Sequence, residues 1–171
     1  MRFYPATSSK NKCSIEFNPS FIIDGNYSFK VQARDKNNNY SGDNEYQINF
    51  EVITESSISN VYNYPNPFST KTHFVFTLTG STFPDDILIQ IFSVSGRVVK
   101  EINLSEIGNI KIGHNKTDYF WDGTDHYGDR LANGIYFYKV TAKINGEDID
   151  HRETSGDVSF KKGFGKMYLF R

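Results

Sequence analysis

The sequence contains a single cysteine, Cys13, among its 171 residues. One thiol excludes an internal disulfide and any cysteine-based zinc site built within one chain. No apolar run approaches the roughly 18 residues that a membrane-spanning helix requires. The N-terminal segment Met1–Pro5 has a basic residue but no apolar stretch, so it does not form a signal peptide. If the protein is exported, we expect the signal to belong to a longer parent protein.

The sequence also has few leucines and alanines, and its net charge is close to zero. The chain has 16 isoleucines against 5 leucines and 4 alanines, and aromatic residues make up 16% of it. Helices favour leucine and alanine, whereas β-branched and aromatic side chains fit a pleated, half-buried surface. The 19 basic and 20 acidic residues nearly cancel, so nothing attracts nucleic acid or an anionic membrane. The composition therefore predicts an all-β protein without a nucleic-acid partner.

Residues 1–56 show the alternation of short strands. Apolar and polar residues alternate over 27–34 and again over 46–52, and a third short strand is expected at 13–17. The residues of 35–39 tolerate the left-handed backbone of a turn. Three strands do not close a sandwich. We therefore interpret residues 1–56 as the C-terminal strands of a preceding immunoglobulin-like or fibronectin III-like domain.

Residues 57–171 are predicted to form a second domain, with the polar stretch 55–60 as the boundary. Two prolines in 64–68 exclude a central strand and are expected to hold an extended lead-in. About seven strands follow, including 74–78, 87–92, 97–102 and 135–142, with hairpin turns at Ser95-Gly96 and Asn145-Gly146. This density of strands and turns predicts an immunoglobulin-like β-sandwich, in which no helix is needed.

Candidate chemical sites in the sequence are weak. Asp122, Asp125 and Asp129 suggest calcium, but their spacing does not fit the EF-hand loop, and a turn with solvated acids is favoured. The four histidines lack metal-ligand spacing. The segment 163–166 is not a phosphate-binding loop, and no nucleophile elbow is present. We expect no catalytic residue, no metal and no cofactor in this chain, although the parent protein can still be an enzyme.

Aromatic residues allow two interpretations. Tyr136, Phe137 and Tyr138 could form a stacking platform for sugars, but packing on the two faces of a strand is favoured. Trp121 is expected in the core, with Asp122 and Gly123 forming the turn that lets it tuck in.

Several motifs occur in an ordered series from residue 61 onward. They are Asn63–Phe68, Ile89–Phe92 with Ser95–Val99, Trp121–Asp125 with Gly128, and Leu131–Tyr138. This order resembles the FlgD-type immunoglobulin-like domain, first named in the flagellar hook-capping protein. The same domain forms many C-terminal sorting domains of the type IX secretion system in Bacteroidetes. The matching positions that define the fold motif are Pro65, Asn66, Pro67, Phe68, Gly96, Trp121, Asp122, Gly123, Gly134 and Tyr136.

The final residues resemble the end of such sorting domains, where Gly-x-Lys precedes alternating apolar residues and a last basic residue. The resemblance implies a module that is recognised by the outer-membrane secretion machinery, namely its shuttle and sortase components. It also implies export through the periplasm to the medium or cell surface, where a sortase removes the module and leaves the cargo attached to lipopolysaccharide. We expect a monomer. The implied sorting strand comprises Gly163, Gly165, Lys166, Met167, Tyr168, Leu169, Phe170 and Arg171.

The terminal segment carries four basic residues in eleven positions and no acid. These are either the lysines that protect a solvated edge strand or part of a strand read by strand addition. With the resemblance, we favour recognition by strand addition. Deleting the strand is then expected to leave the fold intact and to abolish export. The alternatives are a structural or adhesive spacer, or a carbohydrate-binding sandwich.

Overall fold

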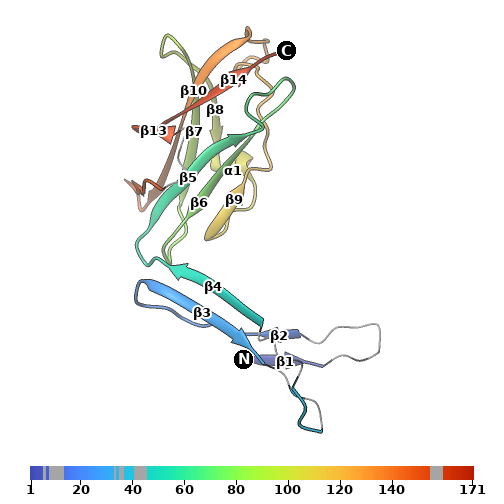
Figure 1. Cartoon of the computed structure of the whole chain (residues 1–171). Helices are drawn as coiled ribbons and strands as arrows, with labels where there is room; N and C mark the ends of the chain where they lie inside the picture. Colours follow the sequence, from blue (N-terminus) through green and yellow to red (C-terminus); the bar gives the residue numbers. More distant parts are fainter. Residues whose placement is uncertain (6, 8–13, 33, 35–36, 41–45, 155–159) are drawn as a thin grey trace. The chain divides into compact units, whose positions relative to one another are not determined.

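The structure is a computed structural model that describes residues 1–5, 7, 14–32, 34, 37–40, 46–154 and 160–171. The chain divides into two compact units, Met1–Thr54 (unit 1) and Glu55–Arg171 (unit 2). Both units are built from β-strands (Figure 1). Each unit is described by itself below.

Unit 1 contains two antiparallel strand pairs in its described residues. The strand β1 (Arg2–Tyr4) pairs with β2 (Ser14–Glu16), and β3 (Gly25–Val31) pairs with β4 (Tyr46–Val52). The sequence predicted β2, β3 and β4, whereas β1 is too short to show an alternation. Two residues of the predicted strands fall outside the described residues: Cys13 of 13–17 and Ala33 of 27–34.

Aromatic rings contact one another in unit 1. Phe21 lies 4.7 Å from Tyr27 and 5.5 Å from Phe50 between ring centroids, and Tyr27 stacks on Phe50 at 6.0 Å. Between the strands, Asn38 adopts a positive φ of 69°, as the turn predicted over 35–39 requires. Asp35 and Lys36 of that turn lie outside the described residues.

Unit 2 is built from two β-sheets (Figure 1). The first has the strand order β13-β14-β10-β7-β8, with β11 also paired to β10, and the second has the order β12-β5-β6-β9. All pairings are antiparallel except that of β12 with β5. The bounds are β5 Ser57–Tyr64, β6 His73–Leu78, β7 Asp86–Ser93, β8 Val98–Asn103, β9 Gly113–Lys116, β10 Gly134–Ile144, β11 Glu147–Asp148, β12 Asp150–His151, β13 Phe160–Lys161 and β14 Phe164–Leu169.

The core of unit 2 follows from period-two alternation. On β7, Ile87, Ile89 and Ile91 have no exposed surface, while the residues between them stay partly exposed. β10 alternates in the same way, and β14 buries Met167 and Leu169 completely. Because each buried branched or aromatic side chain stabilises a fold by about 1.5–3 kcal/mol, this layer dominates the energetics. The prediction of an all-β sandwich is confirmed.

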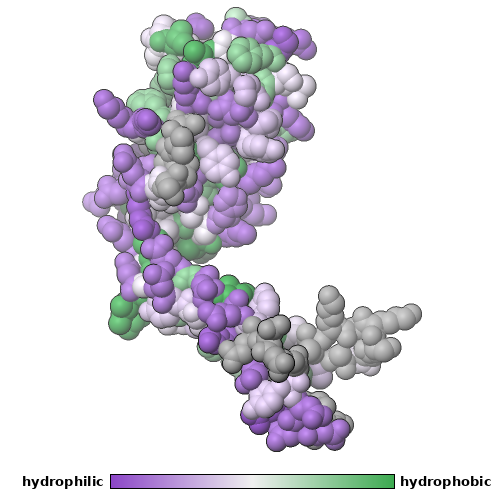
Figure 2. Space-filling model, in the orientation of Figure 1, coloured by the Kyte–Doolittle hydropathy of each residue, from purple (hydrophilic) through white to green (hydrophobic). Residues whose placement is uncertain are grey.

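Hydrophilic residues dominate the visible surface of unit 2 (Figure 2), where smaller hydrophobic areas lie between them. None of the helices formed by the described residues is long and apolar enough to cross a membrane.

The division between the units falls at Glu55, the first residue of the stretch 55–60 that was interpreted as the boundary. The rest of that stretch supplies the start of β5, where Ser57 and Ser59 are buried and the Ser57 and Thr79 hydroxyls share a hydrogen bond of 2.8 Å. The expectation that no helix is needed is wrong, because a short helix, α1 (Leu104–Ile107), interrupts the β-structure. Its first turn is closed by the Asn103 amide, which donates to the Glu106 carboxylate at 2.9 Å.

Candidate functional site

The implied sorting strand is β14, which lies within the first sheet of unit 2. It pairs with β10 from Tyr138↔Gly165 to Gly134↔Leu169. Gly165 crosses directly over the Tyr138 ring, where a Cβ atom would overlap the ring. This close approach explains why glycine stands at that position. Gly163 lies in the turn between β13 and β14, with a positive φ of 80°.

The outer edge of β14 is closed by the segment around Asn66. The Asn66 amide donates through Nδ2 to the Lys166 carbonyl at 2.9 Å, and its Oδ1 accepts from the Tyr168 amide at 3.0 Å. Phe68 continues this pairing: its amide donates to the Tyr168 carbonyl at 3.0 Å, and its carbonyl accepts from the Phe170 amide at 2.9 Å. One side chain and one residue of backbone therefore act as a short neighbouring strand.

This edge contradicts recognition of the folded strand by strand addition. Strand addition needs free backbone donors and acceptors, whereas those from the Lys166 carbonyl to the Phe170 amide are already bonded. The segment 64–68 also differs from the expected extended lead-in. It bends, both of its X-Pro peptide bonds are cis, and Phe68 is buried in the core.

The end of the chain is held by a second asparagine. Asn133 accepts from the Arg171 amide at 2.9 Å and donates to the Arg171 carbonyl at 3.1 Å. The Arg171 guanidinium donates to the Leu131 carbonyl at 3.1 Å and to the Asp122 carbonyl. It passes over Gly123, where a Cβ atom would overlap the guanidinium and the Leu169 side chain.

Trp121 links these segments from inside the sandwich. It is fully buried, its Nε1 donates to the Thr124 carbonyl at 2.8 Å, and its backbone pairs with Thr72. Its ring centroid lies 5.6 Å from that of Phe68 and 5.5 Å from that of Tyr136. The structure thus places Trp121 in the core, as the sequence predicted.

The motif residues converge around the second half of β14. We call the group of Asn66, Phe68, Asp122, Gly123 and Asn133 the strand clamp, because each contacts β14 or Arg171. Pro65 and Pro67 flank Asn66, and Trp121 packs against Phe68 of the clamp. Gly134 and Tyr136, which lie on β10, pair with Leu169 and Met167 of β14. Gly96 stands apart, in the turn between β7 and β8, where its φ is 81°.

Sequence reasoning named Asn66 but missed its role and that of Asn133. Each hydrogen bond of the clamp joins residues far apart in sequence, 100 and 102 positions for Asn66. The available signal was chemical: an asparagine amide offers both a donor and an acceptor, which is what an unpaired strand edge requires.

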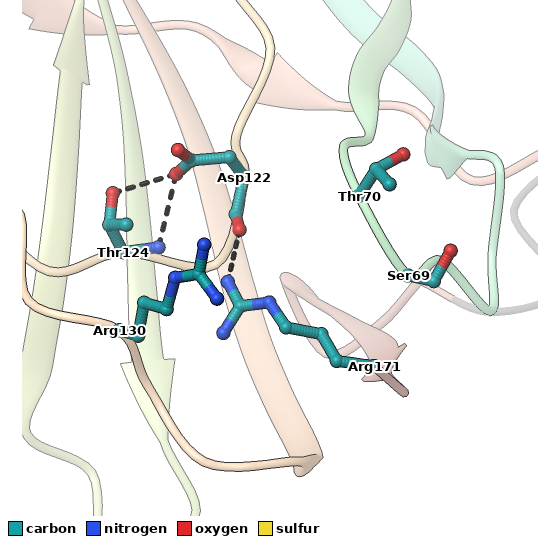
Figure 3. A pocket seen from close by; sticks show the side chains of 6 residues that line it. All are labelled: Ser69, Thr70, Asp122, Thr124, Arg130 and Arg171. Carbon is teal, nitrogen blue, oxygen red and sulfur yellow. Dashed lines mark hydrogen bonds between the residues drawn. The ribbon is translucent and has the colours of Figure 1, made fainter.

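A cleft of about 430 Å³ lies beside the clamp. It is lined by Ser69, Thr70, Asp122, Thr124, Arg130 and Arg171. Figure 3 shows that the Asp122 carboxylate turns toward Thr124, whose amide and hydroxyl donate to it at 3.1 and 2.7 Å. Arg130 and Arg171 enter the cleft from different segments of the chain.

The acidic loop after Trp121 is organised by its own backbone. The Asp125 carboxylate accepts from the Tyr127 amide at 2.9 Å and from the Asp129 amide at 3.0 Å. Such bonds are typical of Asx turns, and they engage the carboxylate of Asp125, one of the three acids that had suggested calcium. Across the described residues, no group of three or more histidine, cysteine, aspartate or glutamate side chains is arranged to hold a metal ion.

The structure contradicts the sugar platform proposed for β10. Tyr136 is 7% exposed and Tyr138 is fully buried, so neither ring can stack on a sugar. The Tyr138 ring packs edge-on against Phe74 at 5.2 Å. The packing interpretation of this strand is therefore confirmed.

Two tyrosines near the clamp hold their protons more tightly than usual. Burial, followed by the negative charges of Glu106 and Asp122, raises the pKa of Tyr119. Burial also raises the pKa of Tyr136, and the positive charge of Arg171 partly offsets that rise. The Tyr136 hydroxyl donates to the Ala132 carbonyl at 2.7 Å, which agrees with a neutral phenol.

Comparison with known proteins supports the fold. No protein-family description and no curated relative matches the chain. Among solved structures, it is similar to dimeric latent PorU from Porphyromonas gingivalis, with a TM-score of 0.50 and 19% sequence identity. The similarity covers 86% of this chain but 12% of the PorU chain. At this identity the likeness concerns the fold alone, and the FlgD-type assignment stays a prediction.

Proposed function

We propose that unit 2 is the C-terminal sorting and surface-anchoring module of a larger secreted protein, with β14 as its address. Two observations support this proposal. The terminal sequence resembles the end of type IX sorting domains. The strand clamp holds β14 in one conformation on the surface of the sandwich.

The observation that carries the proposal is the outward row of side chains on β14. Lys166 lies over the Tyr168 ring at 5.0 Å, and Tyr168 stacks on Phe170 at 6.2 Å. Phe170 is 54% exposed, whereas the alternate residues Met167 and Leu169 are fully buried. A partner can therefore read a basic and aromatic row without opening the core.

This arrangement changes the expected mode of recognition. Because the strand clamp occupies the backbone edge, the secretion machinery would bind the outward side chains, with aromatic anchors supplying most of the affinity. The module itself would have no catalytic role. Its partners would be the shuttle and sortase components of the outer membrane, and its destination the medium or the cell surface, reached through the periplasm.

Export of a fluorescent reporter tests the proposal. The chain is attached, behind a signal peptide, to the reporter in a bacterium with a working type IX system. Deletion of β14 is a poor test, because it removes Met167 and Leu169 from the core and so contradicts the expectation of an intact fold. The better variant is Lys166→Glu combined with Tyr168→Thr and Phe170→Ser, which changes outward side chains and leaves the buried ones in place.

We expect the unsubstituted chain (the parent chain of the variants) to bring the reporter to the surface or the medium, and the triple variant to leave it in the periplasm. A matched control is Lys100→Glu, a half-exposed lysine on β8 at the far side of the same sheet. Circular dichroism of the purified variants checks that each is folded. A folded triple variant that is exported as efficiently as the parent chain contradicts the proposal.

The second candidate is a structural or adhesive spacer. The strand clamp is compatible with a spacer, because hydrogen bonds that hold a terminal strand stabilise a sandwich whether or not a partner recognises it. A spacer predicts that the intact chain leaves the reporter in the periplasm, and that β14 substitutions change stability only.

A further inference from the structure

Two positively charged side chains, Arg130 and Arg171, line the cleft beside the strand clamp. Arg130 comes from the end of the acidic loop, and Arg171 follows β14. Figure 3 shows both side chains extending into the cleft, with Ser69 and Thr70 forming its other side. Like charges repel, and bringing them together in one concave site has a cost unless an anion offsets it.

The partners of Arg171 leave its charge intact. Its guanidinium donates to the carbonyls of Leu131 and Asp122. Carbonyl groups are neutral, so these bonds orient the guanidinium but do not compensate it. The position of this side chain is thus defined by the fold, which is how a binding group is pre-organised.

Arg130 has more freedom. Its side chain is exposed, and no hydrogen bond or ion pair from any described residue engages its guanidinium. The one acid of the lining, Asp122, already accepts two hydrogen bonds from Thr124. Among the side chains of the lining, two guanidinium groups outnumber the one carboxylate.

We propose that this cleft binds a phosphate-type oxyanion, with Arg130 and Arg171 as the charged donors and the Ser69 and Thr70 hydroxyls available as neutral ones. Guanidinium groups suit this ligand because their planar fork offers paired N–H donors to two oxygens. Hydroxyl donors on the other side of the cleft suit a tetrahedral group, which presents oxygens in several directions, better than a planar carboxylate. The proposal concerns unit 2 alone and does not depend on the sorting function.

The test is a titration of the ¹⁵N-labelled chain with inorganic phosphate at constant ionic strength, followed by NMR. We expect saturable shifts confined to the amides around Ser69–Thr70, Asp122–Thr124 and Arg130–Arg171. Sulfate is expected to compete, and acetate to bind more weakly. Equal responses to phosphate and acetate, or shifts that do not saturate, would overturn the assignment.

Substitutions sharpen the test because they act in opposite directions. Arg130→Gln removes an exposed charged donor and is expected to weaken phosphate binding about tenfold. Asp122→Asn keeps the acceptor for Thr124 but removes the lining carboxylate, and is expected to tighten binding a few-fold. The matched control is Arg97→Gln, an exposed arginine in the β7–β8 turn outside the cleft. The proposal fails if Arg130→Gln binds phosphate as the parent chain does, or if Arg97→Gln weakens binding equally.

Discussion

The two units use similar strands but hold them differently. In unit 2, two sheets bury side chains that have no exposed surface, among them Phe74 and Ile89. In the described part of unit 1, every residue keeps some exposed surface, and the strands are joined by pairing and aromatic contacts such as Tyr27–Phe50. Alternation in sequence therefore predicts a strand in either case, whereas the second layer of side chains determines how much each strand contributes to stability.

The largest expected effect comes from removing one aromatic ring in each unit. Phe74→Ala empties a fully buried position and should lower the free energy of unfolding of unit 2 by about 3–5 kcal/mol. Phe50→Ala, in unit 1, should cost less, because Phe50 is only partly buried. Urea unfolding followed by the fluorescence of Trp121 reports on unit 2, and amide exchange of β3 and β4 reports on unit 1. Equal losses would contradict the comparison.

A methyl group added to a glycine should also separate the two units. Gly165→Ala places a Cβ atom into the Tyr138 ring and should destabilise unit 2 by about 1–3 kcal/mol, as overpacking does. Gly25→Ala, at the start of β3, meets Tyr27 at an ordinary 3.7 Å, so stability should change little. Thermal unfolding of both variants measures the difference. A neutral Gly165→Ala would show that β14 does not approach β10 this closely.

Asparagines provide a third pair, with a smaller effect. Asn66→Ala removes two hydrogen bonds of the strand clamp and should cost unit 2 about 1–2 kcal/mol. Asn49→Ala removes two exposed bonds from Ser28 and Gln47, each 2.7 Å long, and should stay within about 0.5 kcal/mol. Chemical unfolding of the two variants is the measurement. If Asn49→Ala lowers the free energy of unfolding as much as Asn66→Ala does, the hydrogen bonds of the clamp contribute no more to stability than exposed ones.

The smallest effect is expected at high pH. The raised pKa values of Tyr119 and Tyr136 mean that the folded unit 2 keeps phenol protons that the unfolded chain releases near pH 10. Their contribution to stability is therefore complete below about pH 10 and is lost as the pH rises through the folded pKa values. Urea midpoints at pH 8 and pH 10.5 measure the loss. Tyr136→Phe should reduce it, and Tyr127→Phe, 91% exposed, should not.

Local patterns predicted much of unit 2. β7, β8 and β10 follow from alternation and from turns at Gly96 and Gly146, because these signals come from neighbouring residues. The start of β5 was not predicted as a strand, because Ser57 and Ser59 are polar residues that become buried only through long-range contacts. The helix α1 had a visible signal in Glu106, three residues after Asn103.

The candidate site was predicted in its parts and not in its assembly. The sequence marked Asn66, Trp121 and the terminal strand as belonging to one family pattern. It could not show that the Asn66 amide closes the edge of β14, because that contact depends on how the two sheets meet. The expected strand addition failed for the same reason: an edge looks free in sequence until its partner is located.

The central claim is that β14 is a structural strand whose outer edge is closed by the strand clamp. Amide hydrogen exchange tests it directly. The account predicts slow exchange in the parent chain at the amides of Tyr168 and Phe170, which point to the outer edge of β14. In Asn66→Ala it predicts faster exchange at the Tyr168 amide, while the Met167 amide, which faces β10, stays protected. Fast exchange at Tyr168 and Phe170 in the parent chain would contradict the account, because the edge would then be open to a partner strand.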